Sequence, residues 1–184
     1  MRLLFIGDVV GIGGCEFLMK KLPDYKKENN VDVCIANGEN SAQGNGITPN
    51  SADSLINAGA DIITANTFQA NEFKLADSGY SVEEIIESGV TLAKKSGAKY
   101  VALDMGPLGQ LMKPMGTLDF QRAYDAFKRQ IVAGKNAGAD VILLETVSDI
   151  LEVKPAVLAV RENSDLPVFV SLSYQEDGRT FVGC

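Results

Sequence analysis

The 184-residue sequence contains no histidine and no tryptophan, and it has only three cysteines. Histidine is the commonest metal ligand in proteins and the side chain that most readily exchanges a proton near neutral pH. Its absence excludes most zinc hydrolase and Ser-His-Asp mechanisms. The cysteines, Cys15, Cys34 and Cys184, are odd in number and widely spaced. They therefore predict free thiols rather than a disulfide framework or a CxxC zinc site.

Basic side chains are also scarce, with 17 lysines and arginines against 24 acidic residues and a formal charge of -7. A surface of that sign argues against general nucleic-acid binding. The N-terminal apolar run is too short for a signal peptide or a membrane span, and Asp8 closely follows it. We therefore expect a cytoplasmic protein with neither a nucleic-acid nor a membrane partner.

The hydrophobic residues, 46% of the chain, gather in six runs of strand length. Most runs are continuous rather than alternating, which is typical of parallel strands buried on both faces. The predicted strands span residues 3–10, 31–36, 61–64, 100–105, 141–145 and 167–174.

Segments with helical spacing lie between these runs. Ser81 and Glu84 have the spacing of a capping box and predict the start of one helix. Thr117 and Ser148 are the predicted N-caps of the next two helices. A motif in which a helix ends at glycine and a strand follows at once recurs three times, at Gly59, Gly97 and Gly138. This repeat predicts a series of helix-strand units in a single α/β domain over residues 1–184.

Six parallel strands are too few for a closed (βα)8 barrel, which needs eight. We therefore expect a mainly parallel open sheet of strand order 2-1-3-4-5-6, with helices on both faces, as in Rossmann-like and flavodoxin-like folds. A partial (βα)8 barrel is the alternative. Either arrangement leaves edge strands, and a homodimer through one of them is expected.

Polar side chains follow the predicted strands, at the end where α/β proteins bind ligands. The functional interpretation is a polar pocket, with oxygen ligands for a hard cation such as Mg²⁺ or Mn²⁺. The alternative is that these residues cap helices and solvate loops. The residues are Asp8, Asn37, Glu39, Asn40, Asn66, Thr67, Asp104, Glu145, Ser171 and Ser173.

The first third of the chain resembles the bacterial metallophosphoesterases of the YmdB type. The motifs that carry the resemblance are LFIGDVVG at residues 4–11, IANGEN at 35–40 and GxGITP at 44–49. That family hydrolyses phosphodiesters, including cyclic nucleotides, at a two-metal centre. The resemblance implies that Asp8, Glu39 and Asn40 are metal-site residues. The family's next motif, Gly-Asn-His, is replaced here by the sequence around Asn66, and the later histidine ligands are missing.

Residues 58–184 resemble the homocysteine-binding (βα)8 barrel of cobalamin-dependent methionine synthase and related homocysteine methyltransferases. The motifs are GADIITANTF at residues 59–68, GPLG at 106–109, GADVILLET at 138–146, VFVSLS at 168–173 and GRT at 178–180. The resemblance implies that Glu145 contacts the homocysteine amino group and that Asn66, Thr67 and Phe68 line the substrate pocket. Ser173 is a further expected member of that site. The family's zinc, held by three cysteines in the last strands, has no counterpart in the sequence.

The two resemblances meet near residue 60, which predicts a chimera of a phosphoesterase-like and a methyltransferase-like segment. We expect a folded α/β domain without a complete active site and without robust catalysis. One alternative is residual binding of homocysteine or another small amino acid, with a methyltransferase-related role. The other is a metal-dependent phosphodiesterase that uses Asp8, Glu39, Asp104 and Glu145 as oxygen ligands for Mg²⁺ or Mn²⁺.

Overall fold

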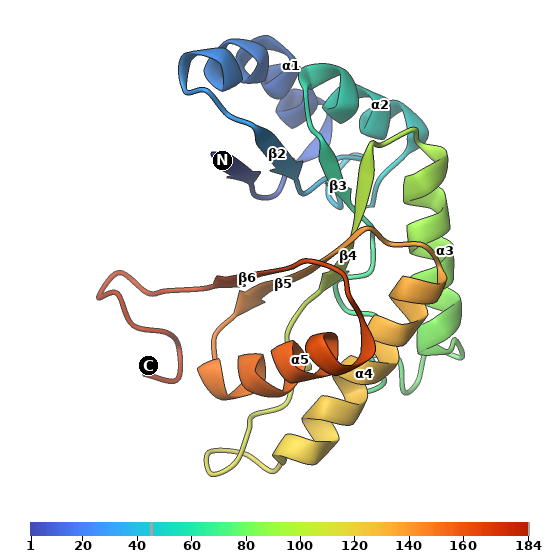
Figure 1. The fold of residues 1–184 in the computed structure, drawn as a ribbon, viewed down its shortest axis with the longest axis vertical. Coiled ribbons are helices and arrows are strands. Elements are labelled where there is room, and N and C mark those ends of the chain that lie inside the picture. Colours follow the sequence, from blue (N-terminus) through green and yellow to red (C-terminus); the bar gives the residue numbers. More distant parts are fainter. Residues whose placement is uncertain (45, 184) are drawn as a thin grey trace. The chain divides into compact units, whose positions relative to one another are not determined.

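The computed structural model describes residues 1–44 and 46–183, and strands alternate with helices along this part of the chain (Figure 1). The elements are β1 (Leu3–Ile6), α1 (Gly11–Glu28), β2 (Val33–Ala36), α2 (Pro49–Ala58), β3 (Ile62–Thr64), α3 (Val82–Lys95), β4 (Tyr100–Met105), α4 (Phe120–Asn136), β5 (Val141–Val147), α5 (Ile150–Asn163) and β6 (Val168–Leu172).

The six strands form one sheet in the order β1-β2-β3-β4-β5-β6. The prediction of a parallel α/β sheet is confirmed, because β1 pairs with β2, β2 with β3, β3 with β4 and β5 with β6 in the parallel direction. The predicted order 2-1-3-4-5-6 is wrong. The consecutive order is that of six strands of a (βα)8 barrel, which was the alternative.

The contacts divide the chain into two compact units. Unit 1 contains Met1–Asn66 and Gly89–Ala102, and unit 2 contains Thr67–Ser88 and the chain from Leu103 onward. Helix α3 and strand β4 contribute to both units. The organisation as a single domain stays a prediction.

In unit 1, α1 and α2 pack against each other, and the strands bury Cys34, Ala36 and Ile63 in a core shared with Leu18 and Leu55. Both crossovers, from β1 to β2 and from β2 to β3, advance in the same direction. Right-handed crossovers that all advance the same way place their helices on one face. In unit 1, the expectation of helices on both faces of the sheet is therefore wrong, because it depended on the predicted strand order.

In unit 2, α4 packs against α5, and β5 pairs with β6. The core contains fully buried side chains from β4, α4 and β5, among them Leu103, Met105, Phe127, Ile131 and Leu143. The carboxyl ends of β4, β5 and β6 form one edge of this unit. They bring together the polar side chains described below.

The repeated glycines end helices as predicted, since Gly59, Gly97 and Gly138 all have φ between 81° and 109°. An L-residue with a side chain rarely adopts this conformation. The Ser81 capping box is also confirmed, because the Glu84 carboxylate accepts from the Ser81 N–H at 2.8 Å and the Ser81 hydroxyl accepts from the Glu84 N–H at 3.2 Å.

The predictions that Thr117 and Ser148 are helix N-caps are wrong. The N-cap of α4 is Asp119, which accepts from the Arg122 N–H, and the N-cap of α5 is Asp149, which accepts from the Leu151 N–H. In both cases an aspartate one or two residues further along provides a charged acceptor, which also interacts favourably with the helix dipole.

Cys15 and Cys34 are free thiols buried in unit 1, as predicted, while Cys184 lies outside the described residues. Burial raises the pKa of the Cys34 thiol to about 11. Within residues 1–44 and 46–183, no helix has the length and apolar character needed to cross a lipid bilayer.

Candidate functional site

The segment after β3 attaches to the end of β4 in unit 2. The Thr67 hydroxyl donates to the Asp104 carbonyl oxygen at 2.8 Å and accepts from the Asp104 N–H at 3.1 Å. The Gly106 N–H donates to the Phe68 carbonyl oxygen at 2.7 Å. A Cβ on Gly106 would come within 2.6 Å of the Phe68 ring, so glycine is required for this close approach. Two predicted pocket residues, Thr67 and Phe68, therefore lie at the carboxyl end of β4.

Strand β5 contains a β-bulge at Glu145, one of the predicted substrate residues. Leu144 pairs with Val170 and Val147 pairs with Leu172, so Glu145 and Thr146 together lie opposite one residue of β6, Ser171. The Thr146 N–H donates to the Ser171 hydroxyl at 3.3 Å. An extra residue of this kind redirects neighbouring side chains and recurs next to active sites.

Thr146 adopts a φ of 60° within the bulge. A β-branched residue in this region is strained by about 1–3 kcal/mol, and such strain gathers at functional sites. Glu145, immediately before it, is only 6% exposed. The chain therefore holds a buried carboxylate at the carboxyl end of β5 by means of a strained backbone.

Ser173, the last predicted substrate residue, directly follows β6. The Ser173 N–H donates to the Val147 carbonyl oxygen at 2.9 Å, which continues the β5–β6 pairing beyond the bulge. Ser173 is exposed, so its hydroxyl is accessible to solvent. Glu145 and Ser173 thus lie on neighbouring strand ends of unit 2.

A buried glutamate fixes the loop that follows β4. The Glu152 carboxylate, in the first turn of α5, accepts from the Leu108 N–H at 2.5 Å. Burial raises the pKa of Glu152 to about 7; the neighbouring Asp149 adds to the rise, and the Leu108 N–H opposes it. Glu152 therefore connects α5 to the loop whose Gly106 packs against Phe68.

Unit 2 concentrates buried acidic groups at this edge. Asp104, Glu145, Asp149 and Glu152 are all less than 9% exposed, and no lysine or arginine of the described residues is buried to that degree. Those of these carboxyl groups that are ionised favour a ligand with a cationic group, and Glu152, whose pKa lies near 7, carries only part of a charge at neutral pH. Glu152 went unnoticed in the sequence because it occupies an ordinary helical position, and only the contact with Leu108 distinguishes it.

The predicted metal residues gather in unit 1. The Asn37 N–H donates to the Ile6 carbonyl oxygen, and the Asn37 carbonyl oxygen accepts from the Val9 N–H, both at 3.0 Å. The Asn40 carbonyl oxygen accepts from the Gly11 N–H at 2.9 Å, and the Asn40 side chain lies 3.5 Å from a Glu39 carboxylate oxygen. These bonds join the loops that carry Asp8, Glu39 and Asn40.

Asn66, the fifth predicted substrate residue, belongs to unit 1 and is exposed. Its side-chain amide nitrogen lies 4.0 Å from the position that a Cβ would take on Gly46. Its role in a site with Glu145 stays a prediction.

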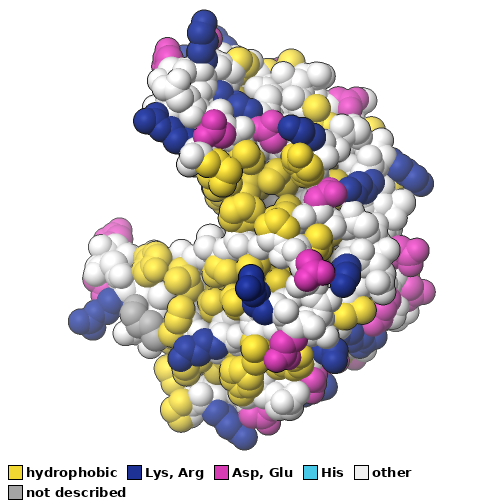
Figure 2. Space-filling model, in the orientation of Figure 1, with side chains coloured by type: hydrophobic (Ala, Val, Ile, Leu, Met, Phe, Trp, Pro, Cys, Tyr) yellow, Lys and Arg dark blue, Asp and Glu magenta, His cyan; other side chains and the backbone are white. Residues whose placement is uncertain are grey.

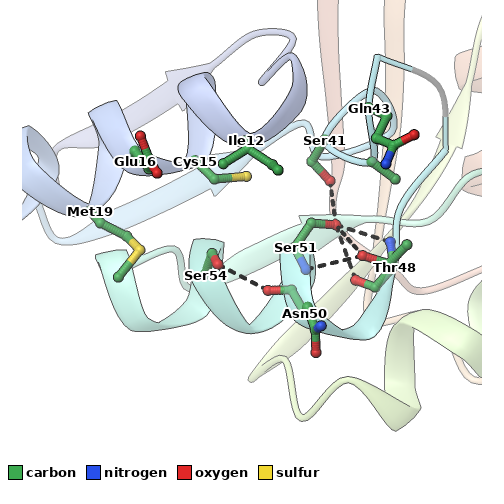
Figure 3. Close-up of a pocket in the computed structure, with 11 residues that line it drawn as sticks. Ile12, Cys15, Glu16, Met19, Ser41, Gln43, Thr48, Asn50, Ser51 and Ser54 are labelled. Atoms are coloured by element: carbon green, nitrogen blue, oxygen red, sulfur yellow. Dashed lines mark hydrogen bonds between the residues drawn. The ribbon is translucent and has the colours of Figure 1, made fainter.

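Unit 1 also contains a cavity of about 890 Å³ between α1, α2 and the preceding loop, which the sequence did not indicate (Figure 3). Ile12, Cys15 and Met19 of α1 face the hydroxyl groups of α2 across it. Those hydroxyls already form a network, in which the Ser41 hydroxyl donates to Ser51 at 2.8 Å and Thr48 and Ser51 cap α2 reciprocally. Because this network caps the helix, we assign the cavity no ligand.

Residues 1–44 and 46–183 contain no group of three His, Cys, Asp or Glu side chains that could hold a metal ion. The two described cysteines, Cys15 and Cys34, are buried in unit 1, and neither belongs to a group of three such side chains. The described residues therefore do not fit the zinc of homocysteine methyltransferases.

A family model for homocysteine S-methyltransferase matches residues 49–183. The chain belongs to this family. The methionine synthase of Mycobacterium leprae is 28% identical over 141 residues, which cover 68% of this chain and 12% of that protein. The oxidized form of the homocysteine methyltransferase MmuM from Escherichia coli superposes with a TM-score of 0.66 at 15% identity and covers 100% of this chain and 66% of that one.

The chain is also similar to phosphodiesterases. The 2',3'-cyclic-nucleotide 2'-phosphodiesterase of Bacillus subtilis is 31% identical over 115 residues, which cover 57% of this chain and 44% of that protein. The chain thus spans less than half the length of these curated relatives. Both resemblances noted in the sequence are confirmed as similarities, and their origin in a fusion stays a prediction.

Proposed function

We propose that the chain binds homocysteine, or a closely related α-amino acid, at the carboxyl ends of β4, β5 and β6, with Glu145 contacting the ammonium group. The buried Glu145 carboxylate, presented by the strained bulge at Thr146, is the observation that carries this proposal. Membership of the homocysteine S-methyltransferase family supports the choice of ligand.

The neighbouring groups suit such a ligand. Phe68, held beside Gly106, offers an apolar surface for the side chain of the amino acid, and Thr67 fixes the backbone on which Phe68 is carried. Ser173 offers an accessible hydroxyl to the ligand's carboxylate. The buried acidic groups favour the ammonium end.

We propose binding rather than robust turnover. Thiol activation in this family uses zinc, and the described residues do not offer a fitting set of ligands. The sequence has no histidine to act as a general base. The domain would then present the amino acid without completing the methyl transfer on its own.

Isothermal titration calorimetry with reduced L-homocysteine tests the proposal. We expect Glu145→Gln to weaken binding by about 2 kcal/mol, roughly 30-fold, because a charge-assisted hydrogen bond becomes a neutral one. 4-Mercaptobutanoate retains the thiol and the carboxylate but lacks the amine, and should bind no more tightly to the parent protein than to the variant.

Glu87→Gln is the matched control, since Glu87 is an exposed carboxylate on α3 in the same unit. It should leave the affinity unchanged. No heat with homocysteine at millimolar concentration, or equal binding by the parent protein and Glu145→Gln, would rule out the proposed site.

A second function, metal-dependent phosphodiester hydrolysis, is supported by the hydrogen bonds that join the Asp8 loop to the loop of Glu39 and Asn40. The similarity to the Bacillus phosphodiesterase supports it as well. Because the described residues contain no group of three His, Cys, Asp or Glu side chains that could hold a metal ion, Asp8, Glu39 and Asn40 would supply only part of the oxygen shell of Mg²⁺ or Mn²⁺, and water would supply the rest. Hydrolysis of a generic phosphodiester with added Mn²⁺, abolished by Asp8→Ala, would favour this function, and no hydrolysis would dismiss it.

A further inference from the structure

The loop after β4 is held at two points in unit 2. At its start, the Gly106 N–H donates to the Phe68 carbonyl oxygen at 2.7 Å, and a Cβ on Gly106 would lie 2.6 Å from the Phe68 ring. Two residues further on, the Leu108 N–H donates to the Glu152 carboxylate. Because Gly106 and the ring are in close contact, a shift of the loop at Leu108 also displaces Phe68.

Glu152 is an unusual residue for its position in α5. Its side chain is 4% exposed, and the other buried residues of this helix are all apolar. Even the outer face of α5 is partly apolar, since Leu151 and Leu158 are 36% and 40% exposed and Figure 2 shows hydrophobic side chains at the surface over the helix. Burying a carboxyl group costs free energy that an apolar residue would avoid. What distinguishes Glu152 is its contact with Leu108, 44 residues away in the sequence.

The Leu108 N–H depends on this acceptor. Leu108 is fully buried, so water cannot replace the Glu152 carboxylate while the loop stays in place. A buried N–H group that loses its acceptor is costly, and the chain rearranges to satisfy it. Loss of the Glu152 oxygen atoms therefore moves the loop, and Gly106 moves with it.

We propose that Glu152 is a positioning residue of the amino-acid site: by holding the Leu108 N–H, it keeps Gly106 against Phe68 and so fixes the apolar surface that receives the ligand's side chain. The inference rests on the function proposed above, in which Phe68 contacts homocysteine. Glu152 acts on the ligand through the Phe68 ring. A residue of this kind raises affinity by holding the site in its binding conformation before the ligand arrives.

NMR titration with reduced L-homocysteine tests the effect on binding. Glu152→Met fills the position but offers no oxygen acceptor, and it should weaken binding by about tenfold. Glu152→Gln keeps an oxygen atom for the Leu108 N–H and should stay within about threefold of the parent protein. Both variants remove the charge, so the difference between them isolates the acceptor.

Tyr124→Phe is the matched control for a purely structural effect. It removes two hydrogen bonds at the other end of α5, where the Tyr124 hydroxyl donates to Glu162 at 2.6 Å and accepts from Asn163 at 3.1 Å. The variant should unfold at a lower urea concentration than the parent protein. It should bind homocysteine with unchanged affinity, because it leaves the loop after β4 in place.

A double-mutant cycle tests the route through Phe68. Phe68→Ala should weaken binding, and Glu152→Met should have little further effect in that background, because the ring that it positions is gone. Glu145→Gln and Glu152→Met should instead weaken binding by the product of their separate factors, since the ammonium contact does not depend on the ring. A full tenfold loss from Glu152→Met in the Phe68→Ala background would overturn the proposed route.

Amide hydrogen exchange of the ligand-free protein reports on the loop independently of homocysteine. In Glu152→Met, the Gly106 N–H should exchange about tenfold faster than in the parent protein or in Glu152→Gln, because its bond to the Phe68 carbonyl oxygen opens more often. Gly106→Ala is a second variant, since its Cβ displaces the ring without changing Glu152. It should weaken homocysteine binding as Glu152→Met does.

Unchanged exchange at Gly106 in a folded Glu152→Met variant would overturn the proposal. Faster exchange with unchanged homocysteine affinity would do the same, since the loop would then not support the site. If circular dichroism shows that Glu152→Met does not fold, unchanged affinity in Gly106→Ala refutes the proposal instead. A parent protein that binds no homocysteine refutes the proposed function and the role of Glu152 in binding. Faster exchange at Gly106 in that case shows that the error concerns the ligand rather than the loop.

Discussion

Glu152 makes the stability of unit 2 depend on pH in a direction opposite to that of most carboxylates. It is 4% exposed, and burial raises its pKa from 4.5 to about 7. The folded chain therefore retains a proton that the unfolded chain releases. This contribution to stability is complete below pH 4.5 and is lost as the pH rises through 7.

The size of the effect follows from the pKa. A pKa near 7 in place of 4.5 corresponds to about 3 kcal/mol of unfolding free energy. Glu152→Gln keeps an oxygen acceptor for the Leu108 N–H but cannot ionise. Relative to this variant, the parent protein should lose about 3 kcal/mol of unfolding free energy between pH 4.5 and pH 7. The difference between the two proteins should change little below pH 4.5 or above pH 7.

Urea unfolding followed by circular dichroism, at a series of pH values, measures this difference directly. Subtracting the curve of the variant removes the contributions of all other titrating groups. Glu87→Gln, an exposed carboxylate on α3, should parallel the parent protein throughout. A constant difference between the parent protein and Glu152→Gln across the whole range would refute the argument from burial.

Two further substitutions test packing and charge. Gly134→Ala places a Cβ 2.5 Å from the Leu103 side chain. We expect a loss of about 1–3 kcal/mol from overpacking, more than the gain of about 1 kcal/mol in helix propensity, in urea unfolding. Lys26→Met removes an ion pair to Asp61 at 2.8 Å and a donor to the Gly59 carbonyl oxygen at 2.6 Å. The expected loss of unfolding free energy is about 1–3 kcal/mol. This loss should shrink as the pH falls through the lowered pKa of Asp61, because the protonated carboxyl group no longer forms the ion pair in the parent protein.

The strands and the glycine caps were predictable because each depends on residues close together in the sequence. The strand runs at 100–105 and 61–64 agree with β4 and β3 within one residue. The first run, 3–10, extended too far, because the chain turns after Ile6 so that Val9 can donate to the Asn37 carbonyl oxygen. That bond joins two distant segments, and no local pattern indicates it.

The strand order was not predictable for a related reason. Buried parallel strands have the same apolar composition whichever strand lies beside them, so β1, β2 and β3 give no local sign of their neighbours. The candidate site was predictable only in part. Glu145 was found through its motif, whereas the bulge at Thr146 depends on pairing with Ser171 of another strand.

The consecutive order of the strands has a consequence for synthesis on the ribosome. Each strand pairs with the one translated just before it, so β2 finds its partner as soon as it emerges, and β3 finds β2 in turn. Pairing with the preceding strand closes a shorter loop than pairing with a more distant strand would, although each parallel pair still has to close a helical crossover and forms more slowly than a hairpin. The nascent chain can therefore bury its apolar strands one after another, which shortens the time in which they are exposed to aggregation.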